Sequence, residues 1–193
     1  MKTATDMGIA VYTIGGPCTE EVADTTMCHI LNLYRRVSHL NEAVKSGRIF
    51  FINLYENPEN TGHDINILGK KPQNAEQVRD VADGCMRIRG DKLGIVGLGN
   101  IGTAVALRAK AFGFEVLYYD PEIPDGKGRS LGLKKMNTLN ELLHDSDCVS
   151  VHCALTRQTY NLFNEVSFSK MRQVSYEFKS LLILTFVLGR IFR

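Results

Sequence analysis

A glycine triplet between a predicted strand and a predicted helix constrains the fold of this chain more than any other feature. Residues 97–102 (GLGNIG) have the spacing G-x-G-x-x-G; the apolar run Lys92–Val96 precedes them and the alanine-rich run Ile101–Phe112 follows. The motif alone is weak evidence, because glycine is common in flexible loops. A strand before it and a helix after it are the context in which it forms a phosphate-binding turn.

Each glycine has a physical role in such a turn. Gly97 permits the tight turn out of the strand, Gly99 lets the backbone approach a pyrophosphate, and Gly102 allows close helix–strand packing. The pyrophosphate then lies on the amide groups at the helix N-terminus, where the helix dipole favours anions. The sequence therefore predicts a dinucleotide site at this turn.

An acidic residue completes the pattern. Asp120 stands 18 residues after Gly102, at the end of a second β-rich run, Glu115–Tyr119. A carboxylate there accepts hydrogen bonds from ribose hydroxyls and repels a 2′-phosphate, so NAD(H) is expected over NADP(H). The alternative is a turn residue that ends the strand before Pro121.

Strand and helix patterns alternate from Asp91 onward, which predicts an α/β fold: an incomplete, doubly wound parallel sheet of the Rossmann type. Before Asp91, apolar residues recur with a period close to 3.6 over Glu21–Lys45, which predicts one long amphipathic helix with Thr19 as N-cap. The further expected elements are an extended segment at Gly8–Ile14, a loop or insertion at Arg48–Gly69, a helix at Asn74–Arg87, a helix opened by the capping box Thr138-x-x-Glu141, a strand at Cys148–His152 and a short helix at Glu165–Arg172.

Composition excludes several classes of protein. Hydrophobic residues make up 44% and charged residues 23% of the 193 residues, which is typical of a globular domain rather than a disordered tail. The net charge of +2 gives no reason to expect nucleic acid or anionic lipid as a direct partner. Five cysteines without a C-x-x-C pair favour a reducing compartment, and no metal site is expected. We expect no signal peptide or transmembrane segment, because the longest apolar run, Leu181–Leu188, is too short to span a bilayer.

Several segments resemble the D-isomer-specific 2-hydroxyacid dehydrogenases. They include VADTTMCHILNLYRR, RIRGDKLGIVGLGNIGTAVALRAKAFGFEVLYYDP and LLHDSDCVSVHCALT. Within this family, HILNLYRR, ALRAKAFGF and SDCVSVHC are most similar to the C-terminal-binding-protein branch, the NAD(H)-sensing transcriptional corepressors of animals. The resemblance covers about residues 8–47 and 71–173. Residues 1–193 are therefore interpreted as one incomplete NAD-binding domain, with an insertion at about 48–69 and a divergent tail at 174–193.

The resemblance implies contacts with NAD from three loops and one helix. The loops are the glycine loop, the end of the second strand and the segment after the Cys148–His152 strand; the helix contributes a contact with the pyrophosphate near its start. The implied cofactor-binding residues are Thr25, Val96, Gly97, Leu98, Gly99, Asn100, Ile101, Gly102, Asp120, Cys153, Ala154, Leu155 and Thr159.

The sequence also departs from the family. Asn100 replaces the usual arginine, which removes one phosphate-facing cation, and Arg157-Gln158-Thr159 replaces the branch's Glu-His-Asn. The family's catalytic Arg, Glu and His have no counterpart after Arg172, so no catalytic residue is expected in this chain. His152 stands at a strand end, where a base is conceivable, but packing or an incidental cofactor contact is the favoured interpretation. The resemblance also implies a substrate domain with a cleft for repressor peptides, built largely from an N-terminal segment, and we expect nearly all of it to be missing before Met1.

These observations favour an NAD(H)-binding fragment of a transcriptional corepressor, located in the nucleus or cytoplasm by resemblance and with transcription factors as implied partners. One alternative is an NAD-dependent D-2-hydroxyacid dehydrogenase that transfers hydride to a 2-keto acid, inactive here for lack of catalytic residues. Another is a truncated product without function.

The helix at 21–45 is expected to mediate a homodimer. We also expect part of residues 174–188 to add a surrogate strand to the open edge of the Cys148–His152 strand.

Overall fold

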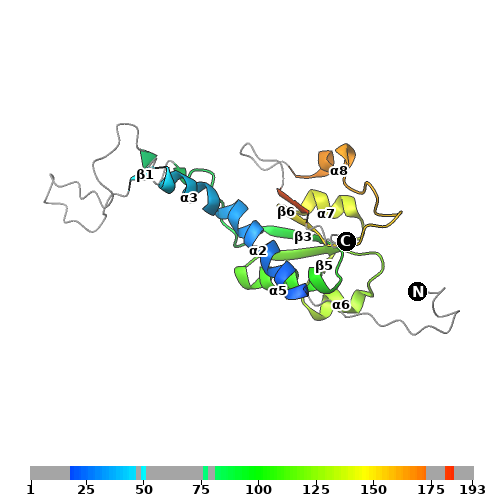
Figure 1. Cartoon of the computed structure of the whole chain (residues 1–193). Helices are drawn as coiled ribbons and strands as arrows, with labels where there is room; N and C mark the ends of the chain where they lie inside the picture. Colours follow the sequence, from blue (N-terminus) through cyan, green and yellow to red (C-terminus); the bar gives the residue numbers. More distant parts are fainter. Residues whose placement is uncertain (1–17, 47–48, 51–75, 78–80, 173–180, 185–193) are drawn as a thin grey trace, which may run out of the picture.

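The computed structural model describes residues 18–46, 49–50, 76–77, 81–172 and 181–184 of the chain. Its centre is a five-stranded sheet with the order β5-β4-β3-β6-β7, in which every neighbouring pair is parallel (Figure 1). The strands are β3 (Lys92–Val96), β4 (Glu115–Tyr119), β5 (Lys134–Lys135), β6 (Cys148–Val151) and β7 (Leu181–Leu184). The helices are α2 (Thr19–Arg35), α3 (Val37–Lys45), α5 (Asn100–Phe112), α6 (Asp125–Ser130), α7 (Leu139–Asp145) and α8 (Glu165–Lys170).

The three central strands end level with one another. Val96, at the end of β3, pairs with Tyr119 of β4 on one side and with Val151 of β6 on the other. The next amides continue the ladder, since Gly97 donates to the carbonyl of Tyr119 at 2.9 Å and His152 donates to that of Val96 at 2.8 Å. The residues that follow the three strands therefore meet at one edge of the sheet, where ligands bind in folds of this kind.

Helices cover both faces of the sheet (Figure 1). Successive residues of a strand point to opposite faces. Leu93 and Ile95 of β3 accordingly pack with α2 and α5, whereas Val96 packs with α7. Gly94 also faces α7, because a Cβ atom there would lie 2.7 Å from Cδ2 of Leu142. β3 is thus buried on both sides, which explains its nearly continuous apolar sequence.

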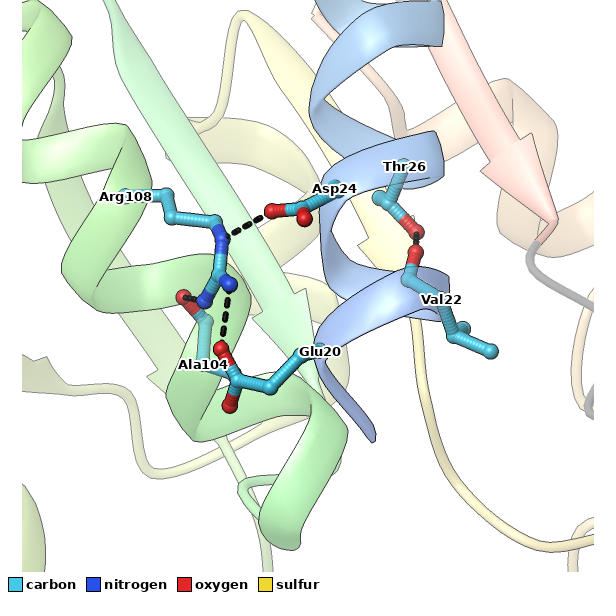
Figure 2. A network of polar contacts seen from close by, with 6 residues as sticks. All are labelled: Glu20, Val22, Asp24, Thr26, Ala104 and Arg108. Atoms are coloured by element: carbon cyan, nitrogen blue, oxygen red, sulfur yellow. Dashed lines mark hydrogen bonds and ion pairs between the residues drawn. The ribbon is translucent and has the colours of Figure 1, made fainter. Parts of the chain in front are cut away.

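An apolar seam and a polar clamp hold α2 beside α5. Figure 2 shows the clamp. In the clamp, the guanidinium of Arg108 donates to Glu20 at 2.5 Å and to Asp24 at 2.6 Å. It also donates to the carbonyl of Ala104 at 3.2 Å. Exposed ion pairs of this kind contribute about 0–1 kcal/mol each, so burial of the seam stabilises α2 more than the clamp does. The seam consists of Ala23, Met27, Ile30 and Tyr34.

The prediction of one helix over Glu21–Lys45 is wrong, because the helix is broken at Arg36. This residue has a φ of 51°, in the left-handed region, and separates α2 from α3. Two contacts stabilise the break. Oδ1 of Asn32 accepts from the amide of Ser38 at 2.7 Å, and the Arg36 guanidinium donates to the carbonyl of Asp83. The apolar period continues across the break, which is why the sequence pattern does not reveal it.

The segment between α3 and β3 contains short strands where the sequence predicts a loop and a helix. β1 (Ile49–Phe50) pairs in parallel with β2 (Glu76–Gln77), so the predicted helix over Asn74–Arg87 is wrong at residues 76 and 77. It is wrong again at Gly84, which lies in a turn with a φ of 80°. Interstrand pairing outweighs local helix signals, which are weak priors against tertiary context. The rest of Arg48–Gly69 and all of Gly8–Ile14 lie outside the described residues.

Helix ends agree with the sequence expectation at some positions and differ at others. Cys18, not Thr19, is the N-cap of α2, and no side chain caps this end. α7 begins as predicted, with Oγ1 of Thr138 accepting from the amide of Glu141 at 3.1 Å. α8 ends at Lys170, slightly earlier than expected. Such differences are usual at helix ends, which fray.

A strand from the C-terminal tail extends the sheet beyond β6. Leu181–Leu184 (β7) pairs in parallel with Cys148–Val151 (β6) along its whole length. The prediction that part of residues 174–188 adds to this edge is therefore confirmed. The pairing covers backbone groups of β6 that an open edge would leave exposed. Residues 173–180 and 185–188 of the predicted segment lie outside the described residues.

Candidate functional site

The loop after β3 contains three glycines with different steric surroundings. Gly97 has a φ of 95°, and a Cβ atom there would lie 2.7 Å from the amide nitrogen of Cys153. At Gly102, a Cβ atom would lie 2.1 Å from the carbonyl oxygen of Gly97. At Gly99, by contrast, a Cβ atom would meet nothing within 4 Å. The fold therefore requires the first and third glycines, whereas the second leaves open space above the loop.

This open space lies at the N-terminus of α5. Gly99 is the N-cap, and no side chain caps the helix. The amide of Thr103 donates back to the carbonyl of Gly99 at 3.0 Å, and the amide of Leu98 donates to Asp120, so the amides of residues 99–102 are those available to an anion. The first amides of a helix lack intrahelical acceptors and form the positive end of its dipole. A pyrophosphate fits this arrangement in both shape and charge.

Asp120 follows β4, and its carboxylate reaches the glycine loop. Oδ2 accepts from the amide of Leu98 at 2.7 Å. Oδ1 accepts from the amides of Glu122 and Ile123, at 2.9 and 3.2 Å. A carboxylate offers about four acceptor positions, so these backbone bonds leave one on Oδ2. Asp120 is half-buried and can accept a ribose hydroxyl there while it braces the loop.

Lys127 reaches the same loop from α6. Its ammonium group donates to the carbonyl of Leu98 at 2.9 Å. The two polar backbone atoms of Leu98 are therefore held by opposite charges, the amide by Asp120 and the carbonyl by Lys127. Sequence reasoning did not identify Lys127, and no motif marks it, because its contact depends on how α6 packs back on the loop.

The loop after β6 meets the glycine loop at Cys153, whose amide nitrogen lies against Gly97. Burial is the main cause that raises the pKa of the Cys153 thiol, so the thiol is protonated at neutral pH. The hydroxyl of Thr159 donates to the carbonyl of Ala154 at 2.6 Å, which closes the loop on itself. Leu155 projects from it and is 79% exposed. Cys153 is thus brought to the site, while Leu155 presents an apolar side chain to solvent.

Three of the implied residues have side chains that pack in the core. Val96 belongs to the α7 side of the sheet, and Leu98 and Ile101 belong to the α2–α5 side. They can offer a ligand only backbone groups. Asn100 is exposed at the first position of α5.

Thr25 is exposed on α2. The ion pairs that fix α2 are made by Glu20 and Asp24 to Arg108, in the second half of α5 rather than at the glycine loop (Figure 2). The predicted contact of Thr25 with the pyrophosphate stays a prediction.

His152 follows β6 and is 9% exposed. Its Nε2 lies 2.9 Å from Oγ of Ser150, while Nδ1 has no partner among the described residues. Burial lowers the pKa of His152 to about 4, so the imidazole is neutral at pH 7. A base buried in this way is poorly placed to take a proton from a substrate, which agrees with a packing role.

The described part of the chain contains no group of three or more metal-ligating side chains. None of its helices is long and apolar enough to cross a membrane. The five cysteines are free thiols.

A family comparison explains this geometry. Residues 70–176 match the family model described as "D-isomer specific 2-hydroxyacid dehydrogenase, NAD binding domain". Because the match covers more than half of the 193 residues, the chain belongs to this family through its NAD-binding domain. The cofactor expected from the sequence, NAD, is confirmed, and the open space at Gly99, the α5 amides and Asp120 fit it.

Two curated relatives have names that point to different functions. The chain is 35% identical over 176 residues to C-terminal-binding protein 1 of Caenorhabditis elegans, a match that covers 91% of this chain and 21% of that protein. It is 32% identical over 175 residues to glyoxylate reductase of Korarchaeum cryptofilum, covering 91% of this chain and 45% of that protein. The chain therefore spans less than half the length of either relative.

Solved structures confirm the expected fold class. The apo form of D-mandelate dehydrogenase from Rhodotorula graminis is similar with a TM-score of 0.66 and 26% identity, covering 88% of this chain and 44% of that one. A formate dehydrogenase from Granulicella is similar with a TM-score of 0.69 and 24% identity, covering 95% of this chain and 40% of that one. At this identity the similarity supports the fold alone.

Proposed function

We propose that this chain is the NAD(H)-binding domain of a transcriptional corepressor of the C-terminal-binding-protein branch, and that it binds the dinucleotide without turning it over. The observation that carries the binding role is the open space at Gly99, bordered by the uncapped end of α5 and by Asp120. The branch is supported by the 35% identity to C-terminal-binding protein 1, close to the 32% shared with a glyoxylate reductase.

Within the site we assign each group to one part of the dinucleotide. The amides of Gly99, Asn100 and Ile101 bind the pyrophosphate, and the free acceptor position of Asp120 binds a ribose hydroxyl. The loop Cys153–Thr159 contacts the half of the dinucleotide that lies across the glycine loop from Asp120. Thr25 contributes a hydroxyl to the pyrophosphate from α2.

Turnover requires groups that this site does not supply. Transfer of a hydride to a 2-keto acid needs an acid or base for the hydroxyl proton and a cation for the substrate carboxylate. His152, at the strand end, is buried and neutral, with Nε2 beside Ser150. These 193 residues are therefore expected to bind NADH but not to oxidise it.

The alternative function is an NAD-dependent D-2-hydroxyacid dehydrogenase. The observation that favours it is the similarity to glyoxylate reductase over 91% of this chain. In that case these 193 residues are inactive for lack of the family's catalytic Arg, Glu and His. Glyoxylate-dependent oxidation of NADH by this chain, above the level of a Gly99→Val variant, would contradict the proposed absence of turnover.

The α2–α3 layer is proposed as the homodimer surface. Val37 and Phe112 line a groove of about 660 Å³ between α2, α3 and α5. Leu33, Val37, Leu107 and Phe112 expose 36–56% of their surface, although large apolar side chains are usually buried. Light scattering that shows a monomer at high concentration, with and without NADH, would contradict this part of the proposal.

Domain organisation, location and partners belong to the same proposal. The chain is one incomplete NAD-binding domain, with an insertion at about residues 48–69 and a divergent tail from residue 174. Its location is the nucleus or the cytoplasm, and its protein partners are transcription factors.

The binding proposal is tested by a thermal melt of the full chain with NADH. A ligand at about 100 times its dissociation constant stabilises the folded state by about 2.7 kcal/mol, which raises the melting temperature by several degrees. Gly99→Val is the matched control, because a Cβ atom at this position meets nothing within 4 Å and the side chain enters the open space that the ligand would use. The proposal fails if NADH leaves the melting temperature of the wild-type chain unchanged.

A further inference from the structure

The surroundings of Asp120 contain hydrogen-bond donors and lysine side chains as well as its own carboxylate. Three backbone amides already donate to its carboxylate. Lys127 is bonded to the same residue of the glycine loop as Asp120. Lys135 forms an ion pair with Asp125, and its raised pKa, caused mainly by that hydrogen bond, also responds to the charge of Asp120. Asp120 therefore shares the residue Leu98 with Lys127, and its charge acts on Lys135.

Lys127 is the lysine whose charge is available to a ligand. Lys135 and Asp125 neutralise each other, so together they add little to the local field. Lys127 is half-buried, and its described partner is a neutral carbonyl rather than a carboxylate. Its ammonium and the Asp120 carboxylate contact the two polar backbone atoms of Leu98, so both groups lie on the glycine loop, next to Gly99.

The other charges nearby do not cancel that of Lys127. Glu122 donates its amide to Asp120, and its side chain is exposed, where water and salt screen the charge. Arg129, also on α6, is exposed and adds positive charge near Asp125. Asn100, at the start of α5, supplies no cation, so among the described residues Lys127 is the cation that hydrogen-bonds to the glycine loop.

We propose that Lys127 is a specificity-determining residue that gives the 2′-phosphate of NADPH a counter-charge beside Asp120, so that this chain binds NADPH as well as NADH. The inference rests on the proposed dinucleotide site. Asp120 alone would select against a 2′-phosphate, because the two anions repel each other. Lys127 offsets that repulsion, and the Asp120 carboxylate still binds the unphosphorylated ribose.

The test measures the dissociation constants of NADH and NADPH for the full chain by fluorescence titration at low salt. The variants are Lys127→Met, which removes the charge, and Lys127→Arg, which keeps it. Lys170→Met is the matched control, because Lys170 is an exposed lysine on α8, on the opposite side of the sheet. A melt of each variant without nucleotide checks that the fold is unchanged.

We expect wild type to bind NADPH within about tenfold of NADH, a difference of 1.4 kcal/mol or less. Lys127→Met should weaken NADPH about tenfold and NADH less than about threefold, while Lys127→Arg and Lys170→Met stay close to wild type. Equal weakening of both nucleotides in Lys127→Met, or unchanged NADPH binding, overturns the inference and leaves the proposed function intact. Absence of NADH binding to the wild-type chain overturns both.

Discussion

Two regions of the molecule are held together in different ways. One is the edge of the sheet around the glycine loop, and the other is the α2–α3 layer. At the edge, Gly97 and Gly102 contact each other, and Asp120 braces Leu98 from the next strand. In the layer, α2 packs its apolar seam on α5, and Arg108 adds exposed ion pairs to Glu20 and Asp24. The loop thus depends on steric limits at single positions. The layer depends on many contacts, each of which contributes little and can be lost without loss of the others. Substitutions should therefore be costly in the first region and mild in the second.

The largest effect is expected from Gly102→Ala. The added Cβ atom would lie 2.1 Å from the carbonyl oxygen of Gly97, so the loop or α5 must move. We expect a loss of at least about 3 kcal/mol in the free energy of unfolding, measured by urea denaturation. Gly99→Ala is the matched variant, because its Cβ atom meets open space and its φ of −71° suits any residue. Similar losses in both variants would contradict the steric distinction between the two glycines.

Acid should destabilise the edge through His152. Its pKa is lowered to about 4 in the folded chain from 6.5, so between these values the unfolded chain binds the proton more tightly. The contribution of the neutral His152 side chain to the free energy of unfolding is complete above pH 6.5. It is lost as the pH falls towards 4, by about 3 kcal/mol in total. Chemical denaturation of wild type and His152→Gln over this pH range isolates the effect from other groups. Parallel pH profiles for the two proteins would show that His152 is not buried and neutral.

Asp120→Ala should affect both stability and binding. It leaves the amide of Leu98 without its acceptor, which costs about 2 kcal/mol, and it removes a ribose contact. We expect NADH to bind about tenfold more weakly and the preference for NADH over NADPH to diminish. Asp120→Asn is the companion variant, because it keeps an acceptor for the amide but removes the charge. An unchanged preference in both variants would show that Asp120 does not select the cofactor.

The smallest effect is expected from Arg108→Ala in the α2–α3 layer. Its ion pairs with Glu20 and Asp24 are exposed, so their loss should cost about 1 kcal/mol or less, and less again at high salt. Arg157→Ala, an exposed arginine in the loop after β6, controls for net charge. A loss above about 3 kcal/mol would show that the clamp, rather than the apolar seam, holds α2 in place.

The difference between local signals and contacts between distant residues also explains how much of the structure the sequence could predict. β3, α5 and β4 are observed within about one residue of their expected bounds, because their signals are local: apolar runs, glycines and an acidic residue. The added strand β7 could also be predicted, since the open edge of β6 and an apolar, β-rich tail segment leave few other pairings.

The remaining features depend on contacts that no short pattern contains. The break at Arg36 is stabilised partly by the carbonyl of Asp83, and β1 pairs with β2 across a long stretch of chain. The role of Lys127 arises from the way α6 packs back on Leu98. Each contact joins residues whose spacing has no periodic signature, so propensity and motif reasoning cannot detect it.

The central claim is that the amides at the start of α5 bind the dinucleotide pyrophosphate, and amide NMR of the ¹⁵N-labelled chain tests it most directly. On addition of NADH, we predict the largest shift changes at Gly99, Asn100 and Ile101, with smaller ones at Asp120 and Cys153. Gly99→Val should abolish them while its other amide signals remain. Unchanged signals at residues 99–101, or largest changes in α7 on the opposite face of the sheet, would contradict the claim.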